Sequence, residues 1–86
     1  MPEICRFYGI TIKMFFGDHL PPHFHARYGE NEALVNINTL ALFAGNIPPR
    51  ALGLVMEWAS LHQEELIELW HKVEKLEPLH RIDPLE

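Results

Sequence analysis

Residues 6–16 read RFYGITIKMFF, and apolar residues recur at every second position along this stretch. A period of two is typical of a β-strand that buries one of its faces. The side chains that this period places on one face are Tyr8, Ile10, Ile12, Met14 and Phe16. We therefore expect a single half-buried strand over residues 6–16, with this set facing the core.

Further strands are predicted beyond a loop at residues 17–22, where Gly17, Pro21 and Pro22 interrupt both helix and strand. The alternation of apolar and polar residues resumes over residues 23–28 and 32–37, which predicts two more strands. The uniformly apolar stretch at residues 40–44 predicts another. The first half of the chain thus predicts a small antiparallel sheet of three to four strands.

The second half of the chain changes its period. After Pro48 and Pro49, which suit the start of a helix, apolar positions recur at spacings of three and four: Ala51, Val55, Trp58, His62, Leu66, Leu69, Val73 and Leu76. We expect one long helix that lasts to Pro78; the alternative is two consecutive helices, the second starting at a capping box of Ser60 and Gln63. A sheet and a helical layer combine as a two-layer α+β domain over residues 1–77, with an extended tail at 78–86.

Length and composition limit the function. A chain of 86 residues makes one domain, and its single cysteine, Cys5, cannot form an internal disulfide. No signal peptide or membrane-spanning stretch is present, so a cytoplasmic protein is expected. The net charge of −5, concentrated in the helical half, argues against non-specific nucleic-acid binding.

The stretch GDHLPPHFHARYGE, residues 17–30, contains His19, His23 and His25. Because His23 and His25 are two apart on a strand, their side chains leave the same face about 6.5–7 Å apart. Two such imidazoles can converge on one ion, with His19, Asp18 or Glu30 as a third ligand. No cofactor is favoured, but a metal site would be a zinc-type site built from His19, His23 and His25.

Two other interpretations of the same residues stay open. His23 and His25 can act as base and acid in metal-independent RNA cleavage, with Arg27 holding a phosphate. We favour a third interpretation, in which both imidazoles lie on a partly exposed face. There they bond loop carbonyls or belong to a protein–protein surface.

Three segments together resemble a family of small bacterial proteins catalogued as domain of unknown function 4160. They are RFYGI at residues 6–10, GDHLPPHFHARYGE at 17–30 and RALGLVMEWASLHQEEL at 50–66, and DHLPPHFHA is the most specific part. The resemblance covers roughly residues 4–77. The family has no established activity, so the resemblance by itself leaves open whether the protein is an enzyme.

The resemblance implies a partner. Genes of this family often lie beside genes of a second family, domain of unknown function 2442, in an arrangement like a toxin–antitoxin pair, and this chain would be the toxin-like half. Unlike its relatives, the chain has almost no charge at residues 40–47, which indicates a surface for a partner or a second copy. We therefore expect an interaction module whose contact residues are His19, His23, His25, Arg27, Leu40, Leu42 and Phe43.

Overall fold

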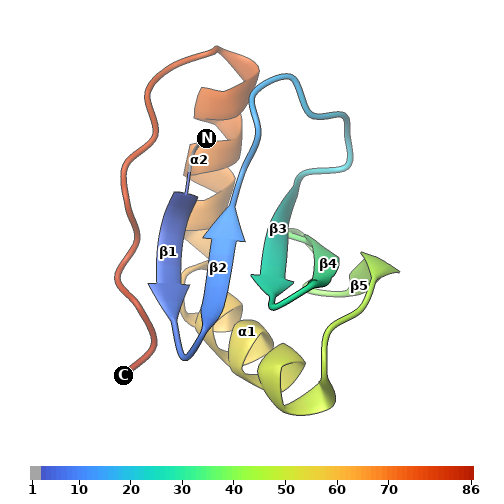
Figure 1. Ribbon diagram of the computed structural model, residues 1–86. Helices are drawn as coiled ribbons and strands as arrows, with labels where there is room; N and C mark the ends of the chain where they lie inside the picture. The colour runs from blue at the N-terminus through green and yellow to red at the C-terminus, as the bar shows by residue number, and fades with distance from the viewer. Residues whose placement is uncertain (1–2) are drawn as a thin grey trace.

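The computed structural model describes residues 3–86 as a five-stranded sheet covered by two helices (Figure 1). The elements are β1 (Glu3–Phe7), β2 (Ile10–Lys13), β3 (His23–Tyr28), β4 (Asn31–Asn36), β5 (Leu42–Gly45), α1 (Pro49–Leu61) and α2 (Gln63–Glu74). All neighbouring strands are antiparallel and follow chain order. The predicted α+β class is confirmed, whereas the predicted number of strands was too low.

The extra strand arises because residues 6–16 form a hairpin instead of one strand. Phe7 pairs with Ile10 across a two-residue turn in which Tyr8 and Gly9 have φ angles of 47° and 77°. Two positive φ values are the requirement of a type I′ turn, which joins tightly twisted strands. Paired residues face the same side, so Phe7 is buried beside Ile10, and Tyr8 is 60% exposed at the turn. Phe16, also expected in the core, is 44% exposed beyond the end of β2.

The helical layer is broken at His62, where φ is −125°. At the break the helical layer contacts the turn after β4, where the Gln63 side chain donates to the carbonyls of Ile37 and Asn38 at 2.7 and 3.0 Å. The Ser60 hydroxyl donates to a carbonyl of its own helix, so no capping box forms. The preference for one long helix was therefore wrong. Within residues 3–86, neither helix has the length and hydropathy needed to cross a membrane.

The C-terminal segment runs in an extended conformation along β1 (Figure 1). The amide of Ile82 donates to the carbonyl of Ile4 at 2.8 Å, and the Ile82 side chain is 3% exposed. The indole of the buried Trp58 donates to the carbonyl of Asp83 at 2.8 Å. The segment thus covers the outer edge of β1 and adds an apolar side chain to the core.

Substitution of two glycines should change stability in opposite directions. Gly45 has a φ of 68°, and a Cβ there would collide with the backbone carbonyl of Glu32 in the neighbouring strand. We expect Gly45→Ala to destabilise the protein by about 2 kcal/mol or more, because backbone has to move. Gly53 lies in α1 with no atom near its added Cβ, so Gly53→Ala should stabilise by about 0.5–1 kcal/mol. Urea unfolding measures both, and equal effects would contradict the close approach of β5 to β4 at Gly45.

The contact between tail and sheet should depend on pH. Hydrogen bonds from the guanidinium groups of Arg6 and Arg81 lower the pKa of the Glu3 carboxyl below its ordinary value of 4.5. A lowered pKa in the folded state means that the stabilisation is fully present above the ordinary value. It is lost as the pH falls through the lowered one. The stability difference between wild type and Glu3→Gln should therefore vanish in acid, as urea midpoints from about pH 7 to about pH 3 would measure. A difference that does not change with pH would exclude this role for Glu3.

Candidate functional site

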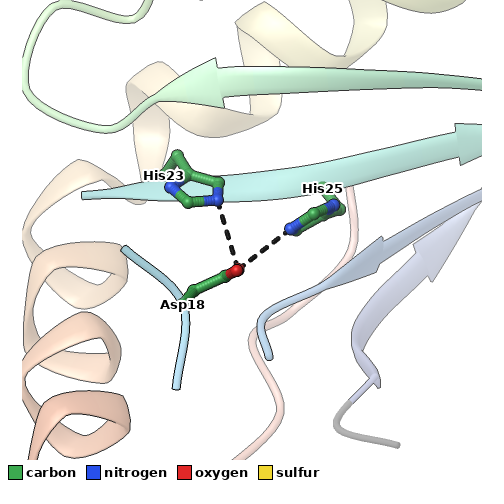
Figure 2. Close-up of side chains that lie close together, drawn as sticks. All are labelled: Asp18, His23 and His25. Atoms are coloured by element: carbon green, nitrogen blue, oxygen red, sulfur yellow. Dashed lines mark hydrogen bonds and ion pairs between the residues drawn. The ribbon is translucent and has the colours of Figure 1, made fainter. Parts of the chain in front are cut away.

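The histidine cluster forms where the loop after β2 folds back over the start of β3. His23 and His25 lie on the same strand, and the loop brings Asp18 to both rings (Figure 2). One oxygen, Asp18 Oδ2, lies 3.2 Å from His23 Nε2 and 3.0 Å from His25 Nε2. The three residues therefore meet at a single point, with ligand-type atoms all within 4.8 Å of one another.

The orientation of His23 is fixed on its other side. Its Nδ1 lies 2.8 Å from the carbonyl oxygen of Pro21 and donates to it, since a carbonyl can only accept. The ring is packed among aromatic neighbours, with centroids 5.4 Å from Trp70 and 5.3 Å from Phe43. The residue is only 5% exposed, so the expectation of a partly exposed face was wrong for His23.

His25 presents the same arrangement with one bond missing. Its Nε2 faces Asp18, and its Nδ1 lies 3.4 Å from Glu32 Oε2 without forming a hydrogen bond. Phe15 packs edge-on against the ring with centroids 4.6 Å apart. Glu32 was not predicted as part of this site. It pairs with Arg27 across β3 and β4, and Arg27 is the next residue after His25 on the same face of β3.

The contacts of His23 favour a cation between its Nε2 and Asp18. The N–H at Nδ1 donates to the Pro21 carbonyl. In a neutral ring, Nε2 would therefore carry a lone pair that faces the Asp18 carboxylate. A lone pair facing a carboxylate oxygen at 3.2 Å is repulsive. A metal cation between Nε2 and the carboxylate oxygen would remove this repulsion.

Two buried polar atoms near the cluster lack partners. Among residues 3–86, the buried side-chain atoms without a hydrogen bond are His25 Nδ1 and Trp70 Nε1. His25 belongs to the cluster and Trp70 packs against His23. Unsatisfied buried groups are uncommon in native proteins and indicate an ordered water, an ion or a functional role. Their concentration here makes the cluster the first candidate for function.

The other residues predicted for this site lie apart from it. His19 is exposed and makes no hydrogen bond or ion pair within the described part of the chain, whereas its neighbour Asp18 takes the third position of the cluster. Arg27 is exposed and donates through Nε to the carbonyl of Gly29 at 3.2 Å. The structure therefore brings His23 and His25 together without His19 and without the guanidinium of Arg27.

Of the residues predicted to contact a partner, Leu40, Leu42 and Phe43 lie in or just before β5, at one edge of the sheet. Phe43 is 44% exposed and also forms one wall of the histidine cluster. Leu42 is half-buried in β5, and Leu40 is half-buried just before it with a φ of 57°. This predicted surface and the cluster are therefore contiguous through Phe43.

Other reactive side chains have simpler explanations. Burial raises the pKa of the Cys5 thiol, which keeps it protonated and unreactive. On α2, Glu65 accepts a hydrogen bond from His80 of the tail at 2.9 Å and lies 3.6 Å from His62. These contacts join the tail to the helix on the protein surface, where each pair contributes little.

Comparison with known proteins gives a family and nothing more specific. No curated protein and no solved structure matches the chain. A family profile with the description "Domain of unknown function (DUF4160)" matches residues 9–71, which include the whole histidine cluster and most of both helices. Because the match covers well over half of the sequence, the chain belongs to the DUF4160 family.

Proposed function

We propose that this protein binds one divalent transition-metal ion through Asp18, His23 and His25. The observation that carries the proposal is the convergence of both Nε2 atoms on one oxygen, Asp18 Oδ2, at 3.2 and 3.0 Å. Two imidazoles and one carboxylate are a common ligand set for zinc and for other first-row metals. The expected ligand set of His19, His23 and His25 is thus revised by exchanging His19 for its neighbour.

The distances fit a metal ion with small adjustments. Two ligands that lie about 2.0–2.1 Å from a tetrahedral ion are themselves about 3.3 Å apart. The two nitrogen–oxygen distances are already within about 0.3 Å of this value. The remaining separation is at most 4.8 Å and would close by side-chain rotation. Asp18 lies in a loop, so its carboxylate can also shift to make room for the ion between the three ligands.

The groups behind both rings support the same proposal. Metal-bound histidines usually donate their second ring nitrogen to a carbonyl or a carboxylate, which fixes the tautomer. Pro21 supplies that acceptor for His23. For His25, moving the ring proton from Nε2 to Nδ1 would aim it at Glu32 Oε2, now 3.4 Å away, and would satisfy the unpaired atom.

Three protein ligands leave at least one coordination position free. Such open sites are typical of catalytic zinc, whereas structural zinc sites are closed by four protein ligands. Phe15 packs against His25, and Phe43 and Trp70 pack against His23, so both imidazole ligands have apolar neighbours. We therefore place the protein among metal-binding proteins that accept a further ligand at the ion, and zinc is the first candidate.

The two other interpretations have less support. An acid–base ribonuclease would need both imidazoles to reach a substrate, yet His23 is buried and Arg27 is engaged by Gly29. A role in a toxin–antitoxin-like pair, with a partner from the domain of unknown function 2442 family, stays a prediction from the resemblance. Phe43, exposed beside the cluster, is where such a partner would touch both surfaces.

Metal binding should appear as thermal stabilisation that depends on the cluster. With Zn²⁺ at about a hundred times its dissociation constant, mass action stabilises the folded state by about 2.7 kcal/mol, a rise of several degrees in melting temperature. Asp18→Asn keeps the size and an acceptor but removes the charge, and His25→Gln removes a ligand nitrogen. Both should abolish the rise, as measured by differential scanning fluorimetry on protein purified without a histidine tag.

His19→Ala is the matched control, because it removes an exposed histidine from the same loop without touching the cluster. It should keep the full stabilisation by Zn²⁺. An unchanged melting temperature of the wild type on adding Zn²⁺, Co²⁺ or Mn²⁺ would end the proposal, as would equal losses in His19→Ala and His25→Gln.

A further inference from the structure

A second hollow lies at the opposite end of the sheet from the histidines. The turn between β1 and β2, the end of β3 and the start of α1 meet there, at the lower end of Figure 1. The cleft has a volume of about 280 Å³ and is lined by Tyr8, Tyr28, Pro48, Arg50, Ala51 and Leu54. None of these residues belongs to the proposed metal site.

Tyr8 occupies a backbone position that does not suit it. Its φ of 47° lies in the left-handed region, which is unfavourable for a bulky side chain. The first position of a type I′ turn favours asparagine, aspartate or glycine. Burial does not compensate for the strain, because Tyr8 is 60% exposed. Strained residues that are not explained by packing often serve function.

Tyr28 forms the other aromatic side of the cleft. It ends β3 and is 39% exposed, although the alternation of the strand would place it with the buried Phe24. Its ring lies close to the turn, because a Cβ on Gly9 would be 3.4 Å from Tyr28 Cε1. The two tyrosines therefore reach the cleft from adjacent segments, and both keep exposed ring surface.

Arg50 brings a positive charge to the cleft. It is exposed and makes no ion pair or side-chain hydrogen bond with any other residue among 3–86. The first turn of α1 contains no acidic residue. Beside the guanidinium, the buried Ala51 and the half-buried Leu54 provide an apolar floor.

We infer that this cleft binds a small aromatic anion. An aromatic ring would pack against Tyr8 and Tyr28, since aromatic pairs gain from stacked and edge-on contacts beyond burial alone. Its carboxylate or phosphate group would take the planar hydrogen-bond donors of Arg50, which match such oxygens in pairs. The volume lies just below the range of about 300–1,000 Å³ of typical ligand pockets, so it suits one ring with its acid group.

The probes that test this inference are benzoate, phenyl phosphate and acetate, titrated into ¹⁵N-labelled protein and followed by amide chemical shifts. Benzoate or phenyl phosphate should give saturable shifts centred on Tyr8, Tyr28 and the start of α1, and the tighter of the two identifies the acid group. Acetate, which lacks the ring, should bind at least tenfold more weakly. Absence of saturable shifts with both aromatic probes would overturn the inference.

Variants separate a binding site from a structural one. Arg50→Ala should weaken the aromatic probe at least tenfold, and Arg50→Lys should restore part of the loss. Tyr8→Asn gives the turn its favoured Asn-Gly pair, so it should raise the melting temperature while weakening the probe. A lower melting temperature in Tyr8→Asn, or unchanged binding in Arg50→Ala, would contradict the proposed roles.

The metal site provides an independent control. His25→Gln should leave the binding of the aromatic probe unchanged, and Arg50→Ala should leave the stabilisation by Zn²⁺ unchanged. Loss of probe binding in His25→Gln would contradict a separate cleft. Failure of Zn²⁺ to bind the wild type would leave this inference standing, because the two sites share no residue.

Discussion

Two buried tryptophans on the helical layer hold the sheet, the tail and the histidine cluster in one arrangement. Trp58 packs against Phe7 and Phe24 with ring centroids 5.6 and 5.8 Å apart, and its indole N–H bonds the tail. Trp70 packs against His23. A buried aromatic ring of this size removes about 150–250 Å² from water, an upper bound of about 4–6 kcal/mol each. In so small a domain, these two side chains are the largest of the core and also position the site.

The class of fold was predictable because the strand period of the first half and the helix period of the second half are both clear. The turn between β1 and β2 and the break between α1 and α2 were not predicted, because neither interrupts the period of the apolar residues. Ile10, Ile12 and Met14 alternate as one strand whether or not a turn precedes them. The turn itself is Tyr8-Gly9, which lacks the Asn-Gly signature. The break between α1 and α2 was not predicted for a similar reason. One non-helical residue, His62, barely shifts the apolar stripe, and the contact made by Gln63 joins residues far apart in sequence.

The candidate site was predictable to the extent that it follows strand geometry. Alternation alone places His23 and His25 on one face, and their Nε2 atoms do converge. Which of Asp18 and His19 joins the two histidines could not be predicted, because a loop has no period that assigns neighbouring side chains to opposite sides. The burial of His23 was hidden as well, since Trp70 and Phe43 reach it from distant parts of the chain.

The two proposed sites share β3 and yet are separated by its length. His23 begins the strand and Tyr28 ends it, so their backbones are about 17 Å apart at about 3.3 Å per residue. Between them, Phe24 and Ala26 are fully buried, so the middle of the strand contributes to the hydrophobic core. Effects of changes this far apart usually add. The ends of the strand are therefore free to carry the polar residues of the two proposed sites, because the core between them maintains the fold for both.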